Sequence, residues 1–547
     1  MTLKDQIKIF FKGDILDDDE ALKRYSTDAS IFSVKPQIVL FPKDSEDIQN
    51  IVKFALEKKK EGKNISVTAR GAGTCMSGGS LNESIILDTT RYMSGVVIKG
   101  KEAVVLPGTF YRDLEKATLS KGLIMPAFPA SKNICAVGGM VANDAGGEKT
   151  LAYGKTGKYV KEMKAVFSDG NEYLIKKISK KELSVINKKR TFEATIYKKL
   201  SNLVLENNDL INSFRPKVQK NSAGYFLWDL FDENGDFDLD KIIVGSQGTL
   251  CILTEITFEL VKVKEYKKLL VLSIKSLDDI PMVVNLARKY KPESIETYDK
   301  YTLKTALKFM PSLIKKMKAK SLSKLFLSFV SEIKMLATFS VPKLTILVEF
   351  ASDSILDVER RINEISFEYK KMGIKNRIAK NDEEINKHWT IRRESFSLLK
   401  KYGRGMRTVP FIDDFIINPE HLPEFLPQLE KILKQYNIIY TIAGHIGDGN
   451  FHIIPLMNMK KSDSKDIIIE VSKKVFDLVV KYKGSITAEH NDGIIRTPFL
   501  SRMYSEKMIE LFKETKNIFD PYNIFNPGKK TDLDLKFLKD HIITDKK

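Results

Sequence analysis

Long apolar runs and closely spaced cysteines are both missing from this sequence of 547 residues. No stretch of 18 or more uncharged apolar residues occurs, so no transmembrane helix is expected. The N-terminus carries acidic residues early and lacks an apolar signal core, which argues against secretion. The three cysteines, Cys75, Cys135 and Cys251, form no CxxC pair. We therefore expect neither an iron–sulfur cluster nor a zinc ribbon within the chain, and scattered thiols are typical of a reducing cytosol.

Acidic residues are fewer than basic ones, and the formal net charge is +19. Such a balance favours anionic partners such as nucleic acid, phosphates or an anionic membrane face. The alternative is a general compositional bias toward lysine that has no bearing on binding partners. Lysine is spread through nearly every segment, so we favour this second interpretation. No recognised nucleic-acid-binding module is present, and we expect no nucleic-acid partner.

The pattern of strands and helices changes near residue 265. Before it, short strands alternate with glycine-rich turns in an α+β pattern rather than a regular βαβ series. After it, strand–turn–helix units recur at wide spacing, which predicts an antiparallel sheet with helices on one face. We therefore predict a first domain over residues 1–264, a second over 265–500, and a C-terminal segment over 501–547 that returns to the first domain.

A lysine-rich insert occupies residues 301–343 of the second domain, with nine lysines and a single acidic residue, Glu332. Apolar residues recur at helical spacing between the lysines. A basic amphipathic helix of this kind can lie on an anionic bilayer. The alternative is a helical insertion whose lysine face is solvated while its apolar face packs on its own domain.

Three glycine-rich clusters mark the first domain: RGAGTCMSGG at 70–79, a stretch over 126–154 with two GG pairs, and VGSQGT near residue 245. Glycine lets backbone N–H groups converge on an anion such as a diphosphate, because no Cβ blocks the approach. The first cluster follows a strand but opens no helix, so it is not the dinucleotide fingerprint of a βαβ unit, and it lacks the GK[ST] of a P-loop. Three such clusters together indicate a backbone that lines an extended ligand.

Two of only six histidines flank one predicted hairpin, in IAGHIGDGNFHIIPL. A tight turn can bring His445 and His452 to the same side, whereas Asp448 is expected to bond backbone N–H groups of the turn. On spacing alone, two such histidines are more often polar turn residues than ligands. The later stretch ITAEHNDG adds Glu489 and His490, and two histidines with one carboxylate suit a divalent metal. Glu489 could instead only orient His490.

An arginine pair, Arg392 and Arg393, lies in a predicted helix, HWTIRRESF. A guanidinium binds a carboxylate through two parallel hydrogen bonds. Neighbouring residues of a helix point about 100° apart. We therefore expect only one of the two to face a pocket and the other to form a surface ion pair.

These clusters, together with YSTDAS, KNSAGY and FDPYNIFNPGKK, resemble the FAD-binding domain of the vanillyl-alcohol-oxidase type flavoproteins. The second half resembles the cap domain of the branch that oxidises D-2-hydroxy acids: glycolate oxidase FAD subunits, D-lactate dehydrogenases and D-2-hydroxyglutarate dehydrogenases. The resemblance implies an α+β fold, with a two-part FAD-binding domain (PCMH-type) and a ferredoxin-like α+β cap. It also implies a non-covalent FAD, held by Arg70, Gly71, Ala72, Gly73, Thr74, Ser77, Gly78, Ser131, Gly138, Gly139, Asn143, Gly146, Gly147, Tyr153, Gly248, Ile252 and Asn526.

The same resemblance implies how the second domain works. His445, His452 and Glu489 match ligands of a divalent metal such as zinc or manganese, and His490 matches the general base. The matching positions give Arg392 to a substrate carboxylate and Asn450 to a further substrate contact.

The implied reaction is oxidation of D-lactate, glycolate or D-2-hydroxyglutarate to the 2-oxo acid. Electrons would pass to a quinone, a cytochrome or a separate iron–sulfur subunit, in the cytoplasm or at the inner face of the membrane through residues 301–343. The alternative is a flavin-dependent transferase of the alkylglycerone-phosphate synthase type. Its cap relies on consecutive histidines, and this chain has no two adjacent histidines.

Overall fold

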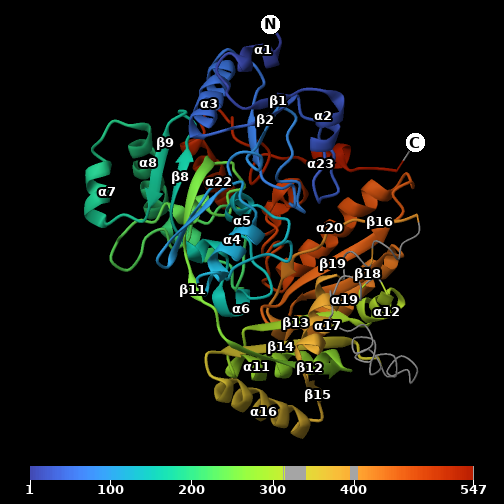
Figure 1. Ribbon diagram of the computed structural model, residues 1–547. Helices are drawn as coiled ribbons and strands as arrows, with labels where there is room; N and C mark the ends of the chain where they lie inside the picture. The colour runs from blue at the N-terminus through green and yellow to red at the C-terminus, as the bar shows by residue number, and fades with distance from the viewer. Residues whose placement is uncertain (312, 314–340, 395–398, 400–404, 546–547) are drawn as a thin grey trace.

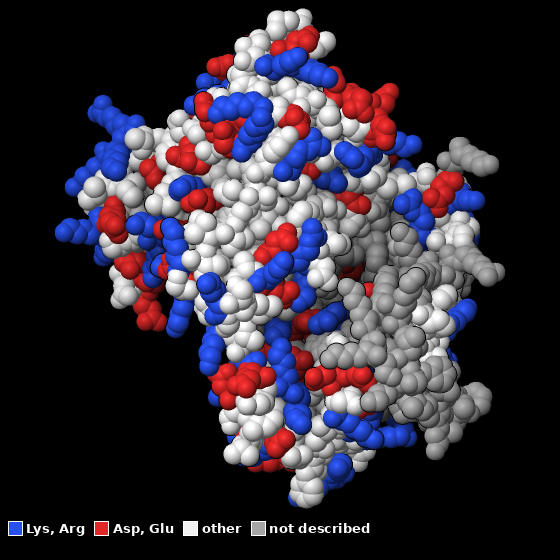
Figure 2. All heavy atoms as spheres, viewed as in Figure 1, with Lys and Arg blue, Asp and Glu red and all other residues white. Residues whose placement is uncertain are grey.

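The computed structural model describes residues 1–311, 313, 341–394, 399 and 405–545 (Figure 1). Most of the lysine-rich insert therefore lies outside the described residues, apart from helix α12 (Lys300–Lys308) at its start. Among the described residues, no helix has the length and apolar character needed to cross a bilayer. Lysine and arginine side chains are scattered among acidic ones on the face shown in Figure 2, as a general lysine bias predicts.

The N-terminal part is built on a four-stranded sheet in the order β1 (Asp14–Leu16), β2 (Ile38–Phe41), β4 (Ile85–Asp88) and β3 (Val67–Arg70). Strands β2, β4 and β3 are parallel, whereas β1 runs antiparallel to β2. Helix α3 (Ser45–Lys60) turns one apolar face, formed by Ile48, Ile51, Val52 and Ala55, onto this sheet. The first glycine cluster begins where β3 ends, so its loop is anchored by a buried parallel strand.

A second, five-stranded antiparallel sheet follows, in the order β5 (Val96–Lys99), β6 (Glu102–Val105), β10 (Ile252–Glu259), β8 (Val160–Val166) and β9 (Glu172–Lys176). Its core includes helices α4 (Tyr111–Leu119), α5 (Val137–Asn143) and α8 (Phe192–Glu206). Helix α22 (Glu506–Phe519), from the C-terminal segment, packs against α8 in the same core. Near the end of the chain, Phe525 pairs with Val67 at the first sheet.

The third sheet is antiparallel and forms the second domain, at the lower right of Figure 1. Its strand order is β15 (Lys375–Ile378), β12 (Tyr266–Ile274), β14 (Leu344–Ser352), β13 (Ser294–Asp299), β18 (Ile439–His445), β19 (Asn450–Met457) and β16 (Arg407–Thr408), with β17 (Phe415–Ile416) also paired to β19.

Helices cover both faces of this third sheet, not one face as the sequence predicted. One face packs against α11 (Ile280–Lys289), α16 (Ile355–Lys371), α19 (Leu422–Gln435) and α20 (Ser464–Lys481). The alternate residues of β12, Leu269 and Val271, point to the other face, where α12 and α17 (Asp382–Arg393) lie. This second face also carries His445 at the end of β18, so α17 and the histidine hairpin share one side of the sheet.

Ion pairs connect that face to the glycine-rich domain. Lys149 pairs with Glu293 at 3.0 Å and Arg393 with Glu148 at 2.5 Å. The contacts fix the end of the third sheet over the second glycine cluster, so the two domains enclose a common space.

A core leucine tests the packing of the second domain. Leu433 of α19 is fully buried, so Leu433→Ala should lower the free energy of unfolding by about 2–5 kcal/mol. Leu356 on α16 is 74% exposed, and Leu356→Ala should change it by no more than about 0.5 kcal/mol. Urea denaturation followed by circular dichroism measures both, and equal midpoints for the two variants would contradict the packing described.

Candidate active site

One cavity lies between the two domains, and both contribute to its walls. The glycine clusters line one side and residues from the end of the third sheet line the other. The structure brings most of the residues predicted to hold FAD to this cavity: Arg70, Gly71, Ala72, Gly73, Thr74, Ser131, Gly138, Gly139, Asn143, Gly146 and Gly248. Cys75, Cys135 and Cys251 also line it.

The other residues predicted to contact FAD lie behind the cavity wall: Ser77, Gly78, Gly147, Tyr153, Ile252 and Asn526. For example, the Tyr153 hydroxyl donates to Glu293 at the domain interface, and the amide of Asn526 donates to the carbonyls of Gly79 and Gln247. Ile252 packs in the hydrophobic core. These residues therefore support the lining and do not form it, and their contact with FAD stays a prediction.

The glycines are needed for steric reasons that differ from position to position. Gly73 has φ +66°, a backbone conformation that residues with a side chain rarely adopt. A Cβ at Gly138 would lie 2.8 Å from Cβ of Pro107, so this glycine permits close packing behind the wall. A Cβ at Gly139 would meet no atom within 4 Å, because that position opens onto the cavity. The wall is thus formed by bare backbone, which fits the flat face and diphosphate of FAD.

The β18–β19 hairpin brings the two predicted histidines together. Ala443 pairs with His452 across the hairpin, so His452 and His445 point to the same face of the sheet. Their rings meet edge to face, with centroids 5.2 Å apart. The four-residue turn therefore places both imidazoles on one side, as the sequence predicted.

Glu489 joins the two histidines at a single oxygen. Its Oε1 lies 3.1 Å from Nε2 of His445 and 3.4 Å from Nε2 of His452. Burial alone would raise the pKa of Glu489, but Lys220 and His445 hold it well below its usual range. Burial lowers the pKa of His452, and Nδ1 of this ring has no hydrogen-bond partner among the described residues. Burial lowers the pKa of His445, but Glu296 and Glu489 raise it overall. An ionised carboxylate and a neutral imidazole are the forms that bind a metal, so Glu489 and His452 fit a divalent cation as they stand, and His445 fits it once its ring is neutral.

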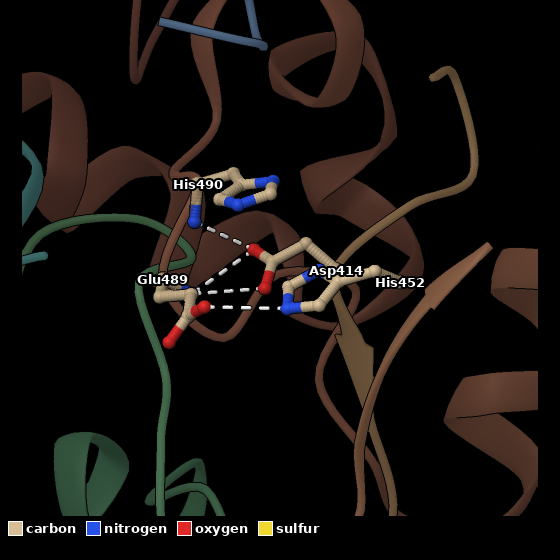
Figure 3. A group of neighbouring side chains, drawn as sticks. All are labelled: Asp414, His452, Glu489 and His490. Atoms are coloured by element: carbon tan, nitrogen blue, oxygen red, sulfur yellow. Dashed lines mark hydrogen bonds and ion pairs between the residues drawn. The ribbon is translucent and has the colours of Figure 1, made fainter. Parts of the chain in front are cut away.

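A second grouping of possible metal donors contains Asp414 and His490 with His452 and Glu489 (Figure 3). The Asp414 carboxylate is already committed, however. It accepts hydrogen bonds from the backbone N–H groups of Ala488, Glu489 and His490 and from other donors around it. We therefore favour His445 over Asp414 as the third ligand.

His490 is held as a base would be. Its Nδ1 lies 2.8 Å from Oδ2 of Asp413, and Oδ1 of Asp413 accepts from the fully buried Arg496 at 2.8 Å. Burial lowers the pKa of His490, but Asp413 and Asp414 raise it to about 9. A cation held by the neighbouring donors would lower it again toward the neutral form that accepts a proton.

Both arginines line the cavity, so the prediction that only one faces it is wrong. Arg393 donates from two nitrogens to the carboxylate of Glu148 in the other domain. The predicted ion pair therefore exists, but it lies at the domain interface. Arg392 donates from Nε to Glu296 at 3.0 Å. The last turn of α17 reaches the cavity at its edge, which lets two adjacent side chains approach it.

Two further hairpin residues lie behind the cavity wall, and the substrate contact of Asn450 stays a prediction. Asn450 is fully buried and does not line the cavity; its amide donates to Asp414 and to the carbonyl of Phe415. Asp448 forms a 2.9 Å ion pair with Lys220, whereas backbone hydrogen bonds were predicted for it. Both side chains brace the site from behind.

Four residues at the site escaped the sequence analysis: Lys220, Glu296, Asp413 and Asp414. Lys220 belongs to KNSAGY, and the two aspartates to FIDDF, where a pair of acids between apolar residues was the available signal. For Glu296, in a strand where every residue is buried, the sequence offers no local signal.

Two families of known proteins match the chain. Residues 36–174 match the family described as "FAD binding domain", and residues 263–530 match "FAD linked oxidases, C-terminal domain". Together they cover most of the chain and support the predicted fold class and the FAD cofactor.

Curated relatives share about a quarter of their residues with the chain. It is 27% identical over 527 residues to D-2-hydroxyglutarate dehydrogenase of Pseudomonas putida, covering 95% of this chain and 50% of that protein. The chain therefore spans about half the length of this relative. It is also 27% identical over 501 residues to D-lactate dehydrogenase of Archaeoglobus fulgidus, covering 90% of each.

Among solved structures, an alkyldihydroxyacetonephosphate synthase superposes with a TM-score of 0.65 at 16% identity, covering 96% of this chain and 84% of that one. At this identity the likeness concerns the fold alone.

Gly139→Ala tests the cofactor cavity. The added methyl group meets no protein atom, so the stability of the protein without FAD should not fall. Because the methyl enters the cavity, FAD content after purification should drop severalfold. Absorbance at 450 nm against protein concentration measures it, with Gly95→Ala, which lies outside the cavity, as the control. Full FAD content in Gly139→Ala would contradict the assignment of this wall.

Proposed function

The chain belongs to the FAD-linked oxidases, and we propose that it oxidises a D-2-hydroxy acid to the corresponding 2-oxo acid. The observation that carries the proposal is the position of His490. Braced by Asp413, it faces the same cavity as the FAD-binding glycines, the donors around Glu489, and Arg392. The cavity thus combines a proton acceptor, an anion-binding group and the wall that is predicted to hold FAD. This combination suits the oxidation of an alcohol, in which a hydride leaves the carbon and a proton leaves the hydroxyl.

The substrate class follows from the relatives and from the charges in the cavity. The names of the relatives include D-2-hydroxyglutarate, D-lactate and glycolate, all small 2-hydroxy acids. Arg392 and Arg393 provide positive charge near the histidines for a carboxylate. We propose D-lactate, glycolate and D-2-hydroxyglutarate as the candidate substrates.

In the proposed reaction, each residue of the cavity has one task. Arg392 binds the carboxylate of the substrate, which sets the orientation of the α-carbon. His490 accepts the hydroxyl proton at Nε2, while Asp413 holds Nδ1 and stabilises the imidazolium that results. Bound FAD supplies the acceptor for the hydride.

We extend the proposal to a divalent metal held by His445, His452 and Glu489. Its support is the approach of Nε2 of both histidines to one carboxylate oxygen of Glu489. Zinc or manganese fits two imidazoles and one carboxylate. When bound, the metal supplies positive charge beside the substrate oxygens. Lys220 neutralises the second carboxylate oxygen of Glu489, at 3.4 Å, and so keeps Oε1 turned toward the histidines.

The electron acceptor belongs to the same proposal. The family resemblance favours a quinone, a cytochrome or a separate iron–sulfur subunit, and we found no nicotinamide fingerprint in the sequence. Contact with a membrane through residues 301–343 stays a prediction, since most of that segment lies outside the described residues.

A flavin-dependent transferase is the second candidate, favoured by the fold shared with the alkyldihydroxyacetonephosphate synthase. The two functions differ in an observable way. An oxidase substrate leaves the flavin reduced, whereas a transferase that returns its electrons within one cycle leaves it oxidised.

Anaerobic mixing of the FAD-loaded protein with D- and L-2-hydroxy acids tests the proposal. D-lactate, glycolate or D-2-hydroxyglutarate should bleach the 450 nm band, and L-lactate and L-2-hydroxyglutarate should not. His490→Gln should slow the bleaching by about 10²–10⁴-fold, the usual contribution of a general base. His541→Gln is the control, because His541 lies near the C-terminus outside the cavity.

Two outcomes would contradict the proposal. If no D-2-hydroxy acid reduces the flavin, the substrate class is wrong. If His490→Gln reduces at the normal rate with normal FAD content, His490 is not the base.

A further inference from the structure

Glu296 connects two groups that have separate tasks in the proposed function. It lies on β13, on the sheet face that carries His445, and only 1% of it is exposed. Its Oε1 is 2.6 Å from Nδ1 of His445, and its Oε2 is 3.0 Å from Nε of Arg392. One buried carboxylate therefore contacts both a proposed metal ligand and the proposed substrate arginine.

On the histidine side, Glu296 decides which nitrogen carries the proton. A carboxylate can only accept, so Nδ1 of His445 must be the donor. The lone pair of the neutral ring is then on Nε2, which points at Glu489. Without Glu296, the ring could place its proton on Nε2 instead and lose its ability to bind a cation there.

Glu296 also determines which edge of the Arg392 guanidinium can bind the substrate carboxylate. Because Nε is already bonded, the two terminal nitrogens are the edge that can take a carboxylate through parallel hydrogen bonds. Among the described residues, no other hydrogen bond from Arg392 is present. The carboxylate of the substrate must therefore approach end-on.

We propose that Glu296 is a positioning residue that sets the distance between the two anchors of the substrate. In a 2-hydroxy acid the hydroxyl and the carboxylate are on adjacent carbons, so their anchors must keep one fixed separation. A single rigid carboxylate that holds both His445 and Arg392 provides it. This inference rests on the proposed function, because it takes the roles of His445 and Arg392 from there.

Glu296→Gln separates this role from simple packing. The amide has nearly the same shape but one acceptor and one donor, so it can satisfy His445 or Arg392 and not both. In the FAD-loaded protein, an amide that keeps Arg392 should raise the zinc dissociation constant, measured by competition with a chelator, about 10–100-fold, and an amide that keeps His445 should raise KM for the active D-2-hydroxy acid by a similar factor. At least one of the two constants should therefore rise.

Glu349→Gln is the matched control. Glu349 is a buried glutamate on the same face of the neighbouring strand β14, and it accepts a hydrogen bond from Trp389 instead. Its amide can still accept that hydrogen bond. The zinc dissociation constant and KM should therefore stay at the wild-type values.

The outcomes distinguish this inference from the proposed function. If the wild-type protein neither binds zinc nor oxidises a D-2-hydroxy acid, the proposed function fails. If it does both and Glu296→Gln changes neither constant, the shared role of Glu296 fails and the proposed function stands. Should Glu296→Gln not retain FAD, Glu296→Asp takes its place. It keeps the charge but retracts by one methylene, so both constants should rise by smaller factors, and two unchanged constants would overturn the inference.

Discussion

The site depends on one buried carboxylate, that of Asp414. It accepts hydrogen bonds from three successive backbone N–H groups, those of Ala488, Glu489 and His490, and so fixes the conformation of that segment. Asp414 itself has φ +70°, an uncommon conformation for a residue with a side chain. The side chains of Glu489 and His490 therefore take their directions from a fixed backbone. Asp413, the preceding residue, holds the ring of His490, so two adjacent aspartates set the segment and its imidazole together.

Around this constraint, nearly every buried charge has an opposite partner. Lys220 pairs with Asp448, Arg496 with Asp413, and Arg392 with Glu296. Buried ion pairs contribute little net stability, because removing two charges from water costs about as much as their attraction returns. Here the ion pairs fix the positions of the side chains, since breaking one pair would leave an unpaired charge in the interior. The proposed metal ligands and the base thus sit within a rigid set of polar contacts, consistent with a site whose donors are fixed in advance.

The parts of the site that form local patterns could be predicted from the sequence. Glycine clusters, a hairpin with two histidines, and an adjacent Glu–His pair are all visible within a few residues. The partners of these groups were missed because they are distant: Glu296 is 149 residues from His445, and Asp413 is 77 from His490. No periodicity encodes such contacts. The helices on the second face of the sheet were missed for a related reason, since a buried strand such as β14 shows no alternation to indicate which face is covered.

We propose that His445, His452 and Glu489 hold a divalent metal beside the FAD-binding wall of the cavity, with His490 left free as the base. An anomalous difference map, from crystals of the zinc-loaded protein measured at the zinc absorption edge, tests it directly. The account predicts one strong peak about 2.0–2.2 Å from Nε2 of both histidines and from a carboxylate oxygen of Glu489. A peak bound instead by Asp414 and His490, or no peak in this cavity, would contradict the account.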